Sequence, residues 1–318
     1  METSLNRMLT AIAGAVVLLD IVWIGSGRFA IDATTYLALA LMIPPCMGAA
    51  YYYGRFRNEP SLSAMFSAAA FLTTFPAAMC LLSYLALTVA GPRIDVYLLA
   101  IDRSLGVSWP AIMAFAADHP WVTVGLNLAY QSIVPQSLLL LVLLGWCQRP
   151  LELYGLCLAI AGGAIAAVGF WTMFPSFGAY SMYHLAPAVA AKLHLAEGVD
   201  YGHELTQLLK NGPGFISPKD LRGLIGFPSF HTVQAIILAW YARNIPYVRW
   251  PSLALNVVVI AATPVHGGHH LIDIAGGCIV AALAITFADS TVRRLRVTKA
   301  AERQMLAVLP EQSPLPAA

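Results

Sequence analysis

The sequence predicts an all-α integral membrane protein with about eight transmembrane helices. Of its 318 residues, 59% are hydrophobic and only 11% are charged, whereas a soluble domain has about a quarter of its residues charged. Apolar runs of the length that a helix needs to cross the hydrocarbon core, roughly 17–25 residues, recur from one end of the chain to the other. These two observations indicate one membrane domain without a separate soluble module.

The apolar runs give the approximate positions of the eight expected helices. They lie near residues 8–25, 34–53, 64–90, 121–147, 152–174, 230–244, 248–265 and 269–291. The run over 230–244 is short for a full crossing, so we expect its first residues to lie below the membrane surface and to line a cavity.

The runs also suggest how the chain is organised. We expect two N-terminal transmembrane helices in residues 1–63 and a six-helix catalytic core in residues 64–292. Two long outer loops interrupt that core over 91–120 and 175–229, and residues 293–318 form a cytoplasmic tail. A loop as long as the second one is typical of a lid or a binding segment.

Positive charges in short connections predict the orientation in the membrane. Lysine and arginine concentrate on the cytoplasmic side of membrane proteins, and here they fall in alternate connections: Arg55, Arg57, Arg149, Arg243, Arg249, Arg293, Arg294, Arg296 and Lys299. Both termini are therefore expected in the cytoplasm. We expect a multi-pass protein of a bacterial inner membrane, with the two long loops on the periplasmic or extracellular side.

Charge and cysteine content argue against several other classes. The net charge of +2 and the lack of a basic cluster with interleaved aromatics exclude a nucleic-acid partner. The cysteines lack CxxC spacing and lie in or beside apolar runs, which indicates packing residues; they are Cys46, Cys80, Cys147, Cys157 and Cys278.

The first cluster of chemically active residues is His266-Gly-Gly-His-His-Leu-Ile-Asp273. If the two glycines form a turn before a helix, His269 and Asp273 lie at i and i+4 on one helical face. The carboxylate would then fix the tautomer of the ring and leave the other nitrogen free as a nucleophile, which we expect to attack phosphorus. The alternative is a His–Asp pair that only caps the helix.

The second cluster is Gly226-Phe-Pro-Ser-Phe-His231, preceded by Lys219 and Arg222. Ser229 and the free N–H groups of a helix start can cradle an anion, and the two cations can bond its oxygens. His231 is then placed to protonate a leaving oxygen as general acid. The alternative is a Pro–Ser helix start, with the two basic residues solvated on an ordinary loop.

Together the two clusters resemble a known family. Pro228-Ser229-Phe230-His231-Thr232 and His269-x-x-x-Asp273 look like the second and third signature motifs of the membrane phosphatidic acid phosphatase type 2 superfamily, in a branch resembling inositol phosphorylceramide synthase. The resemblance implies a six-helix core, a phosphohistidine intermediate at His269, orientation of its ring by Asp273, and His231 as the acid. It requires no metal and no cofactor.

Further stretches carry the resemblance over most of the chain after about residue 64, and two motifs depart from it. Asp102-Arg103-Ser104-Leu105-Gly106-Val107-Ser108-Trp109 and Tyr130-Gln131-Ser132 resemble bacterial members of this branch. The family's Lys-x6-Arg-Pro motif is missing, and Ala262-Thr263-Pro264 stands where the third motif usually has Ser-Arg. The phosphate-binding cation must therefore come from Arg222, Lys219 or Arg103, and we favour Arg222.

The sequence thus predicts a metal-independent lipid phosphatase or phosphotransferase that acts on a phospholipid or lipid phosphate at the non-cytoplasmic face. The motifs do not separate water from an alcohol as the acceptor, nor do they give the oligomeric state. A metal site with His266 and His270 is not favoured, because the spacing is not HExxH and His270 would point about 100° from His269. The rival hypotheses are a transporter or flippase with intramembrane histidines and a non-catalytic lipid-binding protein.

Overall fold

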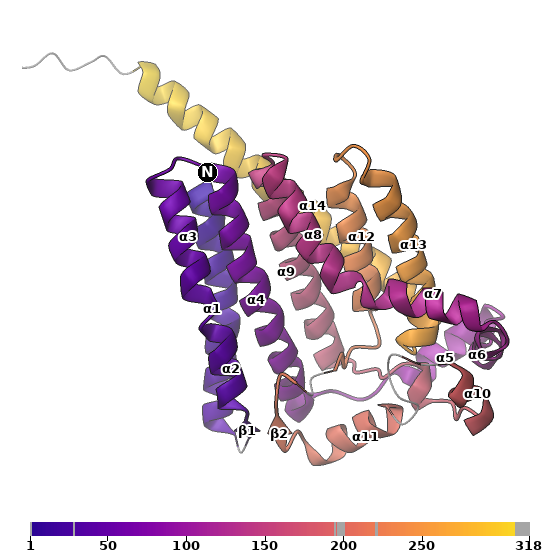
Figure 1. Cartoon of the computed structure of the whole chain (residues 1–318). Helices are drawn as coiled ribbons and strands as arrows, with labels where there is room; N and C mark the ends of the chain where they lie inside the picture. Colours follow the sequence, from indigo (N-terminus) through magenta and orange to yellow (C-terminus); the bar gives the residue numbers. More distant parts are fainter. Residues whose placement is uncertain (1, 28, 194, 196–200, 220–221, 309–318) are drawn as a thin grey trace, which may run out of the picture.

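The chain folds into a bundle of long helices with shorter helices gathered at one end (Figure 1). The computed structural model describes residues 2–27, 29–193, 195, 201–219 and 222–308. Its elements up to the first broken helix pair are α1 (Glu2–Ser26), β1 (Ala30–Ile31), α2 (Ala33–Ala40), α3 (Ile43–Arg55), α4 (Pro60–Ala86), η1 (Leu87–Val89), α5 (Asp95–Ser104) and α6 (Trp109–Asp118).

The second part of the chain continues in the same style. Its elements are α7 (Pro120–Gln131), α8 (Ile133–Trp146), α9 (Pro150–Met173), η2 (Ala179–Ser181), α10 (Pro187–Leu193), α11 (Tyr201–Asn211), β2 (Phe215–Ile216), α12 (Phe230–Ala242), α13 (Arg249–His266) and α14 (Leu271–Val308). The two short strands pair in parallel, which ties the start of the chain to the segment ahead of α12.

The all-α membrane prediction is confirmed, with corrections to individual helices. Five segments of the described chain are helical, long and apolar enough to cross a membrane, and they match the predicted runs: Thr3–Ser26, Ala33–Arg55, Pro60–Val89, Pro150–Met173 and Leu271–Thr298. The predicted helix over 121–147 is divided into α7 and α8, which bend by 48° at Ser132. Helix α12 has 13 residues, so it is shorter than a full crossing, as expected.

The predicted outer loop over 91–120 is largely helical. Helices α5 and α6 have ten residues each and meet at an angle of 76°. Gly106 lies in the break with a φ of 75°, a conformation that glycine adopts without steric cost. Because the break separates the two short helices, the sequence has no continuous apolar run here that would predict a membrane helix. Helices α10 and α11 likewise lie in the predicted loop over 175–229.

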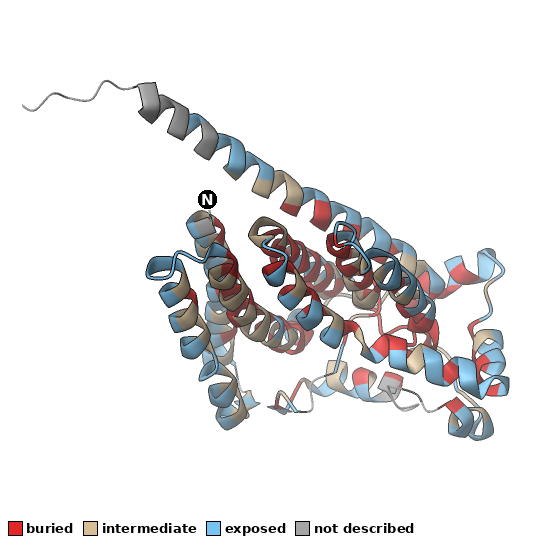
Figure 2. Ribbon diagram, turned by 45° about the horizontal axis from the view of Figure 1, so that its top comes forward, coloured by how far each residue is buried: buried red, intermediate tan, exposed pale blue. Residues whose placement is uncertain are grey.

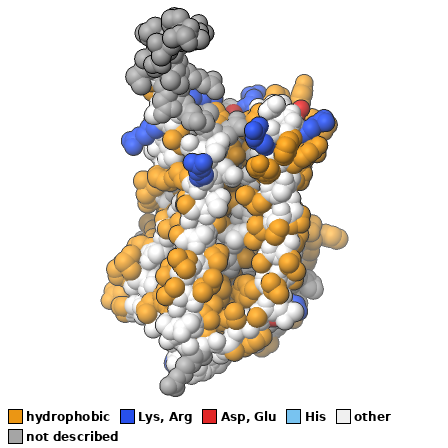
Figure 3. Space-filling model, turned by 90° about the vertical axis from the view of Figure 1, so that its left-hand side faces the viewer, with side chains coloured by type: hydrophobic (Ala, Val, Ile, Leu, Met, Phe, Trp, Pro, Cys, Tyr) orange, Lys and Arg blue, Asp and Glu red, His pale blue; other side chains and the backbone are white. Residues whose placement is uncertain are grey.

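The two ends of the bundle differ in charge. The start of α1 and the far end of α14 lie at the same end of the bundle (Figure 1). Lysine and arginine side chains gather near that end on the face shown in Figure 3. This arrangement agrees with the arginine pattern in the connections, while the side of the membrane that each end faces stays a prediction.

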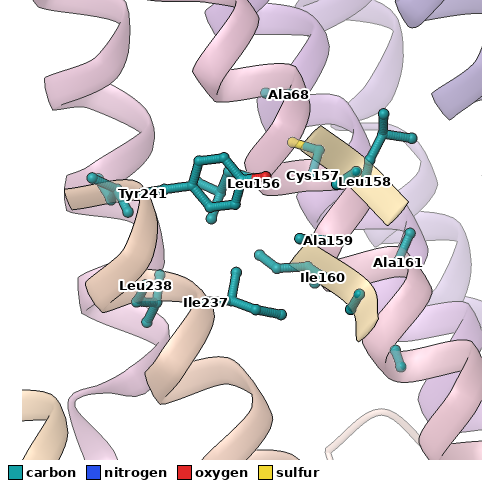
Figure 4. Packing of buried hydrophobic residues seen from close by; sticks show 14 of the residues in the cluster. Ala68, Leu156, Cys157, Leu158, Ala159, Ile160, Ala161, Ile237, Leu238 and Tyr241 are labelled. Atoms are coloured by element: carbon teal, nitrogen blue, oxygen red, sulfur yellow. The ribbon is translucent and has the colours of Figure 1, made fainter. Parts of the chain in front are cut away.

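Helix α9 forms the centre of the core. Every residue from Leu153 to Ala161 is buried, and the surrounding helices cover it on several sides (Figure 2). Figure 4 shows this stretch beside Ile237, Leu238 and Tyr241 of α12. The two helices approach closely, because a side chain at Gly163 would come within 2.7 Å of a methyl group of Val233. Small residues serve such close approach in membrane bundles.

The predicted division of the chain remains a prediction. Leu5, Leu9 and Ala13 of α1 belong to the same buried cluster as α4, α9 and α12, so the N-terminal helix packs against the rest of the bundle. Helix α14 continues without a break to Val308, so the expected tail over 293–318 begins as an extension of that helix. Residues 309–318 of the tail lie outside the described residues.

Candidate active site

The starts of α12 and α14 meet at the end of the bundle opposite the chain ends (Figure 1). The backbone N–H of Ser229, just before α12, donates to the backbone oxygen of Asp273 in α14 at 3.0 Å. A side chain at Gly277 would come within 2.7 Å of Thr232, so the two helices remain close beyond this bond. This contact brings together the two motifs found in the sequence.

His269 forms the expected pair with Asp273. Its Nδ1 lies 3.2 Å from Oδ2 of Asp273, and both side chains are almost completely buried. The same carboxylate oxygen accepts the backbone N–H of His270 at 2.9 Å, which fixes its position. With Nδ1 engaged as a donor, Nε2 is the nitrogen that carries the lone pair.

His231 is held in a different way. It is the second residue of α12, and its ring stacks on Tyr130 of α7 with centroids 4.0 Å apart and an angle of 14° between the planes. Among the described residues no carboxylate pairs with it. Stacking restrains the plane of the ring but leaves both nitrogens available for proton transfer.

One cavity of about 730 Å³ is lined by both histidines. It extends between α4, α8, α9 and α12 and is mostly apolar, with polar groups contributed by Ser83, Ser137, Gln131 and Gln234. None of the described lining residues is a lysine, arginine, aspartate or glutamate. Its volume is in the range of ligand-binding pockets, about 300–1,000 Å³.

The segment Pro175–Tyr180, here called the connector, supports both motifs. The hydroxyl oxygen of Ser176 accepts the N–H of Phe227 at 2.6 Å, just ahead of α12. On the other side, the N–H of Ala179 donates to the backbone oxygen of Gly268 at 2.6 Å. The connector therefore fixes the approach to His231 and the approach to His269 at once.

The turn before His269 requires glycine. Gly268 has a φ of 60°, and a side chain there would overlap the ring of Tyr180. The hydroxyl of Tyr180 donates to the backbone oxygen of Val265 at 2.7 Å, so this ring packs over the turn. The turn inferred from the two glycines is thus present, with the ring of Tyr180 as the reason why position 268 must lack a side chain.

The neighbouring histidines do not form a metal site with these residues. His266 faces the backbone oxygen of Thr123 with Nε2 at 3.1 Å, and His270 lies with Nδ1 3.5 Å from Asp102. Across the described part of the chain, no three His, Cys, Asp or Glu side chains gather closely enough to hold a metal ion.

The predicted phosphate-binding residues lie apart from the cavity lining, except for the region around Ser229. Arg222 is half-exposed and pairs with Glu204 at 3.0 Å, while Lys219 and Arg103 are exposed. Ser229 is fully buried, and its hydroxyl oxygen faces the N–H of Thr232 at 3.5 Å as a helix cap. The capping role offered as the alternative for Ser229 is therefore present, and phosphate binding by these four residues stays a prediction.

A scan against family models identifies the chain. Residues 96–287, more than half of the chain, match the model of the PAP2 superfamily. The chain belongs to this superfamily. No curated protein and no solved structure matches it.

PAP2 superfamily membership supports the coarse functional prediction, a membrane phosphatase or phosphotransferase that acts on lipid phosphates. The matched region includes His231, His269 and Asp273 and also helix α5 from its second residue onward, which was predicted as part of a loop. The match does not separate the branches of the superfamily, so the likeness to inositol phosphorylceramide synthase stays a hypothesis.

Sequence reasoning gave no role to two buried aspartates in α5. Asp95 accepts the N–H groups of Phe177 and Gly178 at 2.7 and 2.9 Å, and Arg93 pairs with it at 2.8 Å. Asp102 accepts the N–H groups of Leu271 and Ile272, which begin α14. Their signal in the sequence was a pair of carboxylates seven residues apart in an apolar setting, where an ionisable side chain is costly.

Proposed function

We propose that this chain is a lipid phosphatase or phosphotransferase that works through a phosphohistidine at His269, on the non-cytoplasmic face of the membrane. The observation that carries the proposal is the shared cavity: His269, oriented by Asp273 at 3.2 Å, and His231 line the same apolar space. A lipid phosphate has the matching form, with a charged head at the histidines and a hydrocarbon part in the cavity.

The proposed reaction has two displacement steps. In the first, the Nε2 lone pair of His269 attacks phosphorus and the bond from phosphorus to the lipid oxygen breaks. His231 gives its proton to that leaving oxygen. In the second, water or an alcohol attacks the phosphohistidine, His231 takes a proton from the attacking oxygen, and the nitrogen–phosphorus bond breaks to restore His269.

Asp273 contributes by orienting the ring of His269 and by stabilising the positive charge that develops on it during attack. A carboxylate on Nδ1 keeps the proton there, so that Nε2 presents its lone pair to phosphorus. The buried position of both groups strengthens this interaction, because the local dielectric constant is low. The chemistry uses no metal ion in this proposal.

The acceptor decides whether the enzyme is a phosphatase or a transferase. Water would release inorganic phosphate, and an alcohol would receive the phosphoryl group. The resemblance of the sequence motifs to the branch that includes inositol phosphorylceramide synthase favours transfer to a lipid alcohol over hydrolysis. The mostly apolar lining of the cavity supports a lipid reactant in either case.

The test is a turnover assay with purified protein in lipid vesicles that contain labelled phosphatidic acid, with and without a lipid alcohol and with and without a chelator. We expect labelled product in each case. If the enzyme is a transferase, the added lipid alcohol should receive the labelled phosphoryl group and form a new labelled lipid. His269→Ala should reduce turnover by about a thousandfold or more. His184→Ala, at an exposed histidine, is the matched control and should keep full activity.

Turnover that persists in His269→Ala would contradict the assignment of the nucleophile. Loss of turnover with chelator would contradict metal independence. Substrate-dependent flux across the vesicle without any ester cleavage would instead favour the transporter.

A further inference from the structure

We propose that Asp102 is a positioning residue for the nucleophile, acting by capping α14 from a neighbouring helix; this rests on the function proposed above. Asp102 lies near the end of α5 and is 2% exposed. Its two carboxylate oxygens accept the N–H groups of Leu271 and Ile272 at 2.8 and 3.0 Å. The contact joins residues that are 169 and 170 positions apart in the sequence.

The two hydrogen bonds to the carboxylate of Asp102, here called the Asp102 fork, fix both the axial position and the rotation of the first turn of α14. The first four N–H groups of a helix have no partner within the helix, and a carboxylate at that end also complements the helix dipole. Each carboxylate oxygen accepts a different one of two consecutive N–H groups. The position of the first turn along the helix axis and its rotation about that axis are therefore both set. A single acceptor would restrict the rotation less.

The constraint reaches His269 over a short path. His269 precedes Leu271 by two residues, and His270 between them lies with Nδ1 3.5 Å from Oδ2 of Asp102. A rotation of the first turn would therefore carry the imidazole of His269 away from the line of attack on phosphorus. An error of about 1 Å in the position of a reacting group can reduce a rate about a hundredfold.

The same cap has a consequence for phosphate binding. The N–H group of His270 bonds Asp273, and those of Leu271 and Ile272 bond Asp102. The two carboxylates thus occupy three donors of this helix start and repel an anion from it. The nucleophile therefore comes from the segment just before α14, and the start of α14 does not bind the phosphate oxygens.

The experiment compares Asp102→Asn with Asp118→Asn in the full-length protein in lipid. Asp118 lies in the adjacent helix α6 and its side chain is 72% exposed, so it is a matched control. Two quantities are measured: hydrogen exchange of the peptide containing residues 269–273, and kcat with KM for phosphatidic acid. An amide has one oxygen acceptor and turns an NH₂ donor toward the other N–H group.

We expect Asp102→Asn to speed hydrogen exchange in that peptide at least tenfold and to lower kcat about 10–100-fold, with KM within threefold. The expected kcat loss is the range seen when residues that orient the ligands of a metal ion are changed in metalloenzymes. An unchanged KM would separate positioning from substrate binding. Asp118→Asn should change neither quantity. Exchange in α9 should stay as in wild type, which reports that the bundle remains folded.

Three results would overturn the proposal or its basis, and they are distinguishable. Unchanged exchange in Asp102→Asn would show that the cap does not hold the first turn. Faster exchange with unchanged kcat would show a cap without a positioning role. If wild type cleaves no phosphate ester while exchange still rises in the variant, the proposed function fails and the cap alone remains.

Discussion

The starts of α12 and α14 each carry one histidine of the site, yet the two starts are built differently. At α14, the carboxylates of Asp102 and Asp273 take the first N–H groups, and Asp273 also bonds His269. At α12, the buried hydroxyl of Ser229 is the one side-chain cap among the described residues, and His231 stacks on Tyr130.

The difference teaches how the two roles are divided. A nucleophile needs a fixed tautomer and a fixed direction of attack, which two carboxylates provide at α14. A proton donor must change its charge during the reaction, and a permanent carboxylate partner would oppose its loss of the proton. At α12 the N–H groups of Phe230 and His231 have no hydrogen-bond partner among the described residues, so they can donate to phosphate oxygens.

Asp273→Asn should have the largest effect, because it removes the carboxylate that orients His269, which has no counterpart at His231. The amide cannot hold the proton on Nδ1 of His269, so the wrong tautomer forms and kcat falls about 10³–10⁴-fold, as when a triad carboxylate is replaced in serine proteases. Steady-state kinetics with phosphatidic acid measure this. Asp289→Asn is the control, since Asp289 lies on the same helix but bonds Tyr241 and Trp240 instead. A loss under tenfold in Asp273→Asn would contradict the orienting role.

His231→Gln should have the next largest effect, and its size should depend on the leaving group. Loss of a general acid costs about 10²–10⁴-fold, but only where the leaving oxygen needs a proton. Because kcat/KM reports the steps up to departure of the leaving group, we expect a large loss of kcat/KM with phosphatidic acid. With p-nitrophenyl phosphate, whose leaving group departs as the anion, we expect a loss of kcat/KM under tenfold. Equal losses with both substrates would show that His231 does not donate the proton.

Ala164→Trp tests the cavity below the histidines. Ala164 in α9 is 6% exposed and lines the cavity, whereas its neighbour Ile165 is 45% exposed and does not. An indole that displaces two methylene groups of a lipid chain costs about 1.6 kcal/mol, so we expect KM for long-chain phosphatidic acid to rise about tenfold. KM for phenyl phosphate should stay within twofold, and Ile165→Trp should change neither value. An equal rise for both substrates would place the lipid chain elsewhere.

Arg222→Ala should have the smallest effect. Arg222 is half-exposed and pairs with Glu204, and exposed ion pairs contribute about 0–1 kcal/mol. We expect KM for phosphatidic acid to rise about fivefold or less, with kcat unchanged. A rise of about fiftyfold, absent in Glu204→Ala, would instead show that Arg222 leaves its partner and binds the phosphate.

Local patterns in the sequence predicted the features that depend on residues close together in the chain. The spacing of His269 and Asp273 gave their contact, and the long apolar runs gave the five long helices. Ser229 was recognised as a possible cap because its capping bond spans only three residues.

Features that depend on contacts between distant segments could not be predicted. The stacking of Tyr130 on His231 joins α7 to α12, and the fork of Asp102 joins α5 to α14. No sequence period encodes either pairing. Helices α5 and α6 were missed because each is short and a glycine break separates them.

The most direct test of the central claim is to trap the intermediate on His269. Wild-type protein in lipid is mixed with phosphatidic acid carrying a labelled phosphate and quenched within milliseconds in alkaline detergent, where a phosphohistidine survives. The peptides are then mapped by mass spectrometry. We predict label on His269, none in His269→Ala, and less in Asp273→Asn than in wild type. Label on His231, or turnover without any labelled protein at any quench time, would contradict the account.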